Sequence, residues 1–313
     1  MTTTWFILAR AVHIGACLLF FGMIAFDRCV ATAVFAGEKS EAGGRWRARI
    51  RLLNLILLPV ILLSGILWFT MVAVTMSGQP PQFDILKVVW SQTQFGTVSK
   101  LRLALWLAAA VLAGPLSFSR WRPALQVFLS RLQLLLSGAL LGSLAWAGHG
   151  QENSPWHLLA DVLHLLVSGF WPAGLLPFAL VLHNLRRGSG PVRWDLIAVL
   201  VRRFSAISLG SVVVLVMTGY VNSWFLIGSF SNLFQQTYGR WLVFKVILLG
   251  FSVAIGAVNL LRLKPCLALK KIEGPESAAA AAQLQFNVQA ELWFGIAIVV
   301  VVAVLGILPP ANR

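Results

Sequence analysis

The chain has 313 residues, of which 58% are hydrophobic and only 11% are charged. A soluble globular domain carries roughly 25% charged residues, so this composition excludes an ordinary soluble domain and indicates an integral membrane protein. The net charge of +15 does not indicate nucleic-acid binding, because the basic residues are not gathered in one polar domain.

Eight apolar segments are long enough to cross a bilayer as helices, since a hydrocarbon core of ~30 Å needs about 20 helical residues. In chain order they cover residues 4–26, 50–77, 98–118, 124–147, 156–184, 203–227, 239–262 and 288–309. The segments are continuously apolar and lack the alternation of barrel strands, so helices that satisfy their own backbone groups are expected. The sequence therefore predicts an all-α membrane protein with eight transmembrane helices.

Most of the 25 lysine and arginine residues lie in or beside the loops that follow the first, third, fifth and seventh spans. The positive-inside rule assigns such loops to the cytoplasm, so both termini and the loops at 78–97, 148–155 and 228–237 are expected on the opposite side. The first span has neither the basic start nor the small-residue cleavage site of a signal peptide, and we expect it to be retained.

A motif with the spacing Trp-x3-Ala-x3-His occurs near the start of two spans. It extends from Trp5 to His13 in the first span and from Trp156 to His164 in the fifth. Each histidine therefore lies ~12 Å below a tryptophan of the membrane interface, at about 1.5 Å per helical residue.

A second match links the third and seventh spans, where an aromatic residue and a glycine precede Arg102 and Lys245 by the same spacing. The two matches predict an internal duplication into halves covering residues 1–147 and 148–313. Because each half has an even number of spans, both halves cross the membrane in the same sense, as parallel repeats about an axis along the membrane normal.

Residues matched by such a repeat are expected to face the shared axis, so His13 and His164 are predicted to form one paired site for a metal or cofactor. The alternative is that each histidine bonds a neighbouring helix as a packing contact. Ionisable groups in hydrocarbon cost on the order of 3 kcal/mol and usually mark pathways or ligand sites, which favours the functional interpretation.

Further metal ligands are predicted near the histidine pair. Cys17 lies one turn deeper on the same helical stripe as His13 and offers a soft ligand to a monovalent metal, although buried cysteine also occurs as a small hydrophobic residue. His149 and His157 lie in or beside the loop above His164, where they can provide a route for an incoming metal ion.

Charged residues accompany both histidines. Arg10 and Asp161 lie one turn before His13 and His164, so they can neutralise each other, or Asp161 can accept the imidazole N–H. For Arg10 the alternative is an extended side chain that reaches the lipid headgroups. Arg102 and Lys245 have the same two interpretations, headgroup contact or a role near the histidines.

Asn222, Asn259 and Glu291 interrupt other spans and are interpreted as helix-packing or interfacial contacts. The chain contains no Walker, dinucleotide-binding, Cys-x-x-Cys or His-x3-His motif, and its loops leave no room for a soluble catalytic domain. ATP coupling within this chain is therefore excluded, and a transporter or metal-binding membrane protein is expected rather than an enzyme.

The chain resembles the copper resistance protein D (CopD) family of bacterial inner-membrane proteins. The residues that carry the resemblance are Gly148-His149, then Asp161-x2-His164-x6-Trp171-x2-Gly174, then Tyr238-Gly239-Arg240-x4-Lys245, and finally Asn259, Arg262 and Pro265. The resemblance covers the whole chain, and the segment at about 200–308 is similar to the conserved family domain. In an inner membrane the side opposite the cytoplasm is the periplasm, so both termini are expected there, and Trp171 is expected beside the pathway.

Membership of this family implies copper handling, usually uptake from periplasm to cytoplasm alongside a periplasmic copper-binding protein of the CopC type. Because the chain begins directly with its first span, we expect any CopC-like partner to be a separate protein. In this interpretation Cu(I) passes from His149 and His157 to His13 and His164, with Cys17 as a deeper relay.

The same histidine pair permits a second hypothesis of another class. In a b-type cytochrome or related redox protein, His13 and His164 are the axial ligands of a haem held between the repeats, and Arg102 and Lys245 meet its propionates. A third interpretation is a membrane scaffold without a ligand, and the sequence alone leaves these alternatives open.

Overall fold

The computed structural model describes residues 2–36, 41–117, 123–147, 154–187, 192–268 and 275–311. Throughout these ranges the chain forms helices, turns and short connections, with no β-strand. Eight of the helical segments there are long and apolar enough to cross a membrane. The predicted all-α, multi-pass membrane fold and its number of spans are confirmed.

The first span consists of α1 (Thr2–Phe26), a π-helical turn (Asp27–Ala31) and the short α2 (Thr32–Val34). The next three are α3 (Glu41–Ser77), α5 (Gln94–Ser117) and α6 (Pro123–Gly142), and α6 ends in a 3₁₀ turn (Ser143–Ala147). Several of these helices extend beyond the apolar segments read from the sequence, because polar residues continue the helix past the hydrocarbon.

The last four spans begin with α7 (Pro155–Phe170) and α8 (Leu175–Arg187), which share one span, and continue with α9 (Trp194–Ile227). The seventh span is α11 (Thr237–Val258), a π-helical turn (Asn259–Leu263) and α12 (Lys264–Ala268), and the eighth is α13 (Pro275–Leu305).

The fifth span is not the single unbroken helix that its apolar run predicts. Turn residues 171–174 separate α7 from α8. Pro172 has no backbone N–H to donate to the preceding helical turn, and a side chain at Gly174 would collide with the carbonyl of Phe170. These two residues account for the break.

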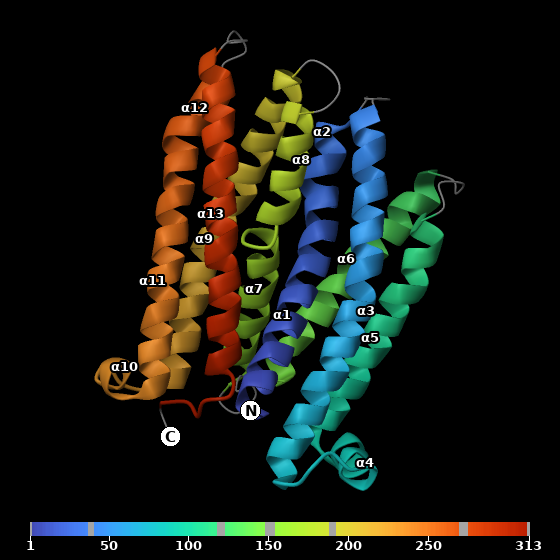
Figure 1. Cartoon of the computed structure of the whole chain (residues 1–313), viewed down its shortest axis with the longest axis vertical. Helices are drawn as coiled ribbons and strands as arrows, with labels where there is room; N and C mark the ends of the chain where they lie inside the picture. The colour runs from blue at the N-terminus through green and yellow to red at the C-terminus, as the bar shows by residue number, and fades with distance from the viewer. Residues whose placement is uncertain are drawn as a thin grey trace.

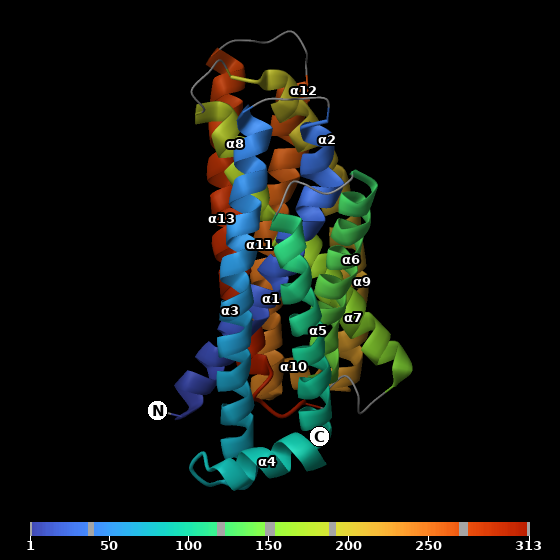
Figure 2. The same ribbon diagram turned by 90° about the vertical axis from the view of Figure 1, so that its right-hand side faces the viewer.

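Two short helices lie in segments expected to be loops, α4 (Phe83–Gln92) and α10 (Asn232–Gln235). Both lie at the same end of the bundle as the two termini (Figures 1 and 2). In α4, Phe83 and Val88 are exposed whereas Val89 is buried, a pattern typical of a helix at a membrane interface. Ten residues are too few to span a bilayer, so a search for spans does not detect this helix.

The most enclosed span is α1, which packs against α3, α6, α7 and α13. It approaches α7 closely at Gly22, where an added Cβ would lie only 2.7 Å from the carbonyl oxygen of Gly169. Small residues allow such close approach between membrane helices. The two halves of the chain therefore meet along α1 and α7.

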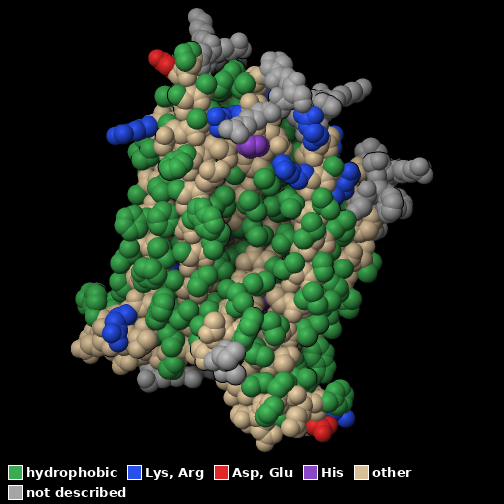
Figure 3. Space-filling model, viewed as in Figure 1, with side chains coloured by type: hydrophobic (Ala, Val, Ile, Leu, Met, Phe, Trp, Pro, Cys, Tyr) green, Lys and Arg blue, Asp and Glu red, His purple; other side chains and the backbone are tan. Residues whose placement is uncertain are grey.

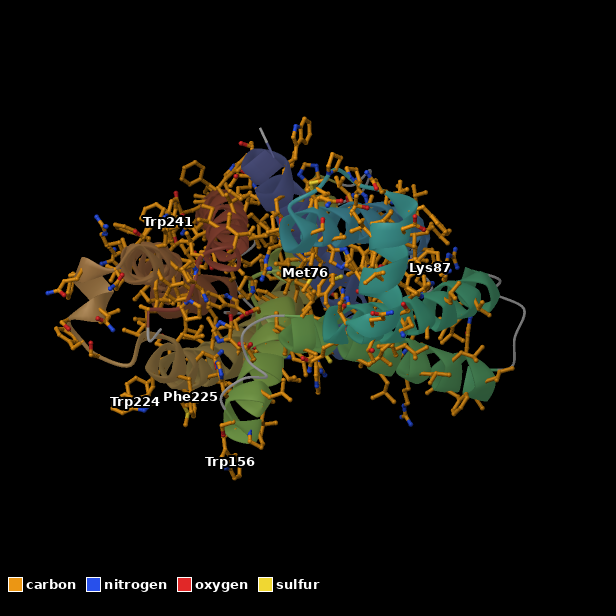
Figure 4. The ribbon with its side chains drawn as sticks, turned by 90° about the horizontal axis from the view of Figure 1, so that it is seen from below. Met76, Lys87, Trp156, Trp224, Phe225 and Trp241 are labelled. Atoms are coloured by element: carbon orange, nitrogen blue, oxygen red, sulfur yellow. The ribbon has the colours of Figure 1, made fainter. Side chains whose placement is uncertain are left out.

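The surface has the distribution of side chains expected of a membrane protein. Hydrophobic side chains cover the middle of the face seen in Figure 3, and most of the basic side chains visible there gather at the end opposite the termini. Seen from the end that carries the termini, the exposed Trp156 and Trp224 point outward from the rim (Figure 4), as interfacial tryptophans do.

Candidate functional site

His13 is held by the neighbouring helix α3 and is only 4% exposed. Its Nδ1 lies 3.1 Å from the carbonyl oxygen of Ile61 and 3.1 Å from Oγ of Ser64. A carbonyl can only accept, so Nδ1 carries the proton and Nε2 presents its lone pair. The ring lies against Gly65, where an added Cβ would approach Cε1 to 3.0 Å.

The Nε2 side of the ring faces Cys17 and Arg102, which with His13 form what we call the His13 cluster. Cys17 Sγ lies 3.9 Å from Nε2, and Arg102 Nη2 donates to Nε2 at 2.7 Å and to Sγ at 3.6 Å. Arg102 also donates to the Leu140 carbonyl and to Ser143 Oγ at 2.9 and 2.6 Å. Arg102 therefore turns inward, and no carboxylate pairs with it in the part of the chain that the structure describes.

The two atoms that face the Arg102 guanidinium, an imidazole nitrogen and a thiol sulfur, are of the types that bind soft metal cations. A metal bound linearly between an imidazole nitrogen and a thiolate sulfur, at about 2.0 and 2.3 Å, separates them by ~4.3 Å. The observed separation of 3.9 Å is close to this value. Because Arg102 donates to both atoms, a metal cation has to displace its Nη2 group.

His164 is held in a similar way by α9. Its Nδ1 lies 2.9 Å from Oγ1 of Thr218, whose hydroxyl donates to a carbonyl of its own helix, so Nδ1 is the donor. An added Cβ at Gly219 would lie 3.4 Å from Cε1. Among the residues with a described position, none forms a hydrogen bond with Nε2, and Ser168 occupies the place one turn deeper.

Sequence reasoning did not identify the residues that orient the two imidazoles. In each half a hydroxyl residue and a glycine stand next to each other, Ser64-Gly65 in α3 and Thr218-Gly219 in α9. This second matched pair is visible in the sequence, but it becomes meaningful only when α3 and α9 are known to face the histidines.

Arg10 and Asp161 bond different partners rather than each other. Arg10 Nη1 donates to the Gly306 carbonyl at the end of α13 at 3.2 Å, and its guanidinium lies 5.3 Å from the centre of the Trp68 ring. Asp161 Oδ1 accepts from Asn222 Nδ2 at 2.7 Å. Asn222, interpreted from the sequence as a packing residue, thus positions this carboxylate.

Lys245, on α11, interacts electrostatically with both Asp161 and His164. Trp171 is buried at the break between α7 and α8, where it packs in the hydrophobic core near Phe178 and Phe204. No hydrogen bond or ring contact joins it to His13 or His164 in the described structure, so its predicted place beside the pathway stays a prediction.

The structure describes one of the two outer histidines, His157. His157 is fully buried in the first turn of α7 and stacks on Phe225, with ring centres 5.0 Å apart and planes 17° from parallel. Phe225, labelled in Figure 4, is the aromatic partner of this ring, and the predicted role of His157 in copper entry stays a prediction. His149 lies outside the described residues, so its predicted role in copper entry stays a prediction.

His13 and His164 make their hydrogen bonds within separate halves, and no contact joins the two imidazoles. Across the described ranges, no three His, Cys, Asp or Glu side chains are close enough to hold a metal ion together. A haem bound by both histidines needs both Nε2 atoms directed at one iron. Because Nε2 of His13 is directed at Arg102 and Cys17, a haem iron at His13 has to displace the Arg102 guanidinium, as a copper ion does, and the haem alternative stays a prediction.

A cavity of about 150 Å³ adjoins the His13 cluster between α3 and α5. Its wall includes His13 and Arg102, together with the rings of Trp68, Trp90 and Trp106. The cluster is therefore beside open space as well as within the helix packing.

Comparison with known proteins identifies the family. Residues 1–159 match the family described as copper resistance protein D-like, N-terminal domain, and residues 198–305 match copper resistance protein D. The chain belongs to the copper resistance protein D family. Copper resistance protein D of Pseudomonas syringae pv. tomato is 32% identical over 260 residues, which cover 80% of each chain.

A second similar protein is the copper transport protein CutJ of Bacillus subtilis (strain 168). It is 30% identical over 178 residues, which cover 54% of this chain and 31% of CutJ. No solved structure matches the chain. Together with the eight spans, these relatives identify a copper-handling membrane protein, as the sequence motifs predicted.

Proposed function

We propose that the protein transports copper from the periplasm toward the cytoplasm across the bacterial inner membrane, with His13 and His164 as copper ligands. The observation that carries this proposal is the His13 cluster. An imidazole lone pair and a thiol lie 3.9 Å apart inside the membrane, and the group between them is a cation.

The ligand chemistry supports Cu(I) as the transported species. Thiol sulfur is a soft ligand and imidazole suits copper, whereas hard divalent cations prefer carboxylate and carbonyl oxygens. The first half offers His13 and Cys17, and the second half offers Nε2 of His164 without a hydrogen-bond partner in the described structure. In this proposal the two histidines are separate copper-binding positions at similar depth.

The two-repeat architecture is part of the proposal. The helix pairs α1/α3 and α7/α9 each place a histidine against a hydroxyl residue and a glycine, and they are the two most extensive helix pairs in the bundle. The contact of α1 with α13 is matched by that of α7 with α6. These correspondences support halves at 1–147 and 148–313, related by an axis along the membrane normal.

The orientation in the membrane follows from charge. The basic side chains visible in Figure 3 gather at the end opposite the termini, which favours a cytoplasmic location for that end and a periplasmic location for both termini. His13 and His164 then lie in the periplasmic half of the membrane. A separate CopC-like protein is the proposed copper donor at this side.

The test is copper uptake into sealed vesicles that contain the purified protein, with metal analysis of the same preparation. We expect the wild type to accumulate copper, the double variant His13→Ala/His164→Ala to lose uptake, and His183→Ala to behave as wild type. His183 is an exposed histidine on α8, at the other end of the bundle, and serves as a matched control. Uptake by the double variant at the wild-type rate, or a haem Soret band in the visible spectrum, would contradict the proposal.

A further inference from the structure

A chain of hydrogen-bonded polar side chains lies in the second half, away from the histidines. On α13, Gln283 donates to Asn287 at 2.8 Å, and Asn287 donates to Asn259 in the π-helical turn at 2.6 Å. Asn259 Nδ2 then donates to Oε1 of Glu291 at 2.8 Å. The network therefore ends on a carboxylate that is only 2% exposed.

Glu291 lies deeper in the membrane than the histidines. Counted along α13 from Leu305, at the end of the bundle that carries the termini, it is ~21 Å away at about 1.5 Å per residue. By the same measure His164 lies ~13 Å from Pro155, at that same end. Glu291 is thus displaced toward the end that we place in the cytoplasm.

Glu291 also lines a cavity of about 140 Å³ between α9, α11 and α13. Only its Oε1 forms a hydrogen bond with a described residue, so Oε2 is left to the cavity. Gly256 lies opposite, where an added Cβ would be 3.6 Å from Oε2. Ser205 and Ser208 line the same cavity, and Ser208 Oγ is buried with no hydrogen-bond partner among the described residues.

No side-chain cation neutralises Glu291 in the described structure. The cavity wall has no basic residue: α8 contributes Leu175 and Phe178, α9 contributes its two serines beside apolar side chains, and the α11 segment contributes Gly256 and Asn259. Arg262, in the same π-helical turn as Asn259, is exposed. An unpaired carboxylate is costly in this setting, so Glu291 requires a bound cation.

The side chains that line the cavity determine which cation it can bind. It contains neither thiol nor imidazole, so it does not suit Cu(I). Its side-chain oxygen ligands are one carboxylate, two hydroxyls and the amide oxygen of Asn259, which also accepts from Asn287. Hard metal cations take about six or more oxygen ligands, which this cavity does not supply. A proton needs only the carboxylate.

We propose that Glu291 is a proton-binding site that takes up and releases a proton as copper moves through the protein. The coupling to copper rests on the proposed transport function, whereas proton binding by Glu291 does not. Glu291 is an ionisable group in the half of the membrane that we place toward the cytoplasm, whereas His13 and His164 lie in the periplasmic half.

Proton binding is tested first by infrared difference spectroscopy of the full chain as the pH is varied. A protonated carboxyl group buried in the protein gives a carbonyl stretching band, which we expect in the wild type and in Glu276→Gln. Glu276 is exposed in the first turn of α13 and is the matched control. A component of this band should be lost in Glu291→Gln, which keeps the shape of the side chain, and should return in Glu291→Asp. An unchanged band in E291Q would overturn the proposal.

Coupling is tested in vesicles loaded with a pH-sensitive dye. E291Q should bind copper with wild-type stoichiometry but show at least a tenfold lower copper-driven proton flux, and its copper uptake should no longer respond to a pH gradient. If the wild type transports copper and E291Q retains the same proton flux, the coupling is wrong. If the wild type transports no copper, the proposed function fails, while the infrared band still decides whether Glu291 binds a proton.

Discussion

His13 and His164 each bond a hydroxyl residue on the next helix and lie against a glycine, but the atoms around their Nε2 differ. Nε2 of His13 accepts from Arg102 and faces Cys17. Nε2 of His164 has no hydrogen-bond partner in the described structure, and a serine replaces the cysteine. Similar helix packing can therefore hold two imidazoles of which one has its Nε2 lone pair in a hydrogen bond and the other does not.

The difference has a consequence for the order of copper binding in the proposed function. A copper ion at His164 meets an available lone pair, whereas a copper ion at His13 has to displace the Arg102 guanidinium. We therefore expect His164 to bind copper before His13.

The largest expected effect comes from removing the available imidazole. In a folded and inserted protein, His164→Ala should abolish high-affinity copper binding, a loss greater than the roughly 10–100-fold that changes to the outer hydrogen bonds of metal ligands cost. The measurement is a Cu(I) titration against a chelator of known affinity. Binding with unchanged stoichiometry and affinity would falsify the role of His164.

Arg102→Met tests whether the guanidinium opposes copper in the first half. Without Arg102, His13 and Cys17 lose a competing cation, so the affinity of this site for Cu(I) should rise about tenfold, or 1.4 kcal/mol. Lys245→Met is the matched variant in the second half, because Lys245 interacts with His164 electrostatically but forms no hydrogen bond with it. A competition titration that shows equal changes in both variants would contradict the difference between the halves.

Exchanging the residue one turn below each histidine should make the halves more alike. Cys17→Ser should weaken Cu(I) binding in the first half about tenfold, and Ser168→Cys should strengthen it in the second half by a similar factor, because thiol is the softer ligand. X-ray absorption at the copper edge should detect sulfur beside copper in S168C even when Cys17 is absent. Absence of sulfur scattering from that double variant would show that the residue below His164 does not reach copper.

The last comparison concerns the packing of the two rings and is expected to change stability rather than copper binding. Gly65→Ala brings a methyl group to 3.0 Å from the His13 ring, whereas Gly219→Ala leaves 3.4 Å at His164. Overpacking costs about 1–3 kcal/mol, so G65A should lower the Tm in detergent and G219A should lower it less. A larger loss in G219A would indicate that α9 is held more rigidly than α3.

The eight spans could be predicted from sequence because bilayer thickness sets the length of an apolar helix. The position of Cys17 on the His13 stripe could be predicted as well, because residues four apart share one helix face. Both inferences depend only on residues close together in the chain.

Features that depend on helix neighbours could not be predicted from one sequence. Asn222 bonds Asp161 across 61 residues, and Asn259 bonds Glu291 across 32. Nothing in either local segment indicates which span lies opposite. For this reason Asn259 and Glu291 were interpreted as packing residues, and the inward turn of Arg102 was one of two open alternatives.

The bond between Arg10 and the carbonyl of Gly306 joins residues 296 positions apart. Every hydrogen-bond partner of the His13 cluster lies between Ile61 and Ser143, so the cluster can assemble while the later spans are still on the ribosome. Arg10 can meet Gly306 only after the last span has been synthesised. During biosynthesis the guanidinium of α1 therefore keeps another partner, such as water or a lipid headgroup, until the nascent chain is almost complete.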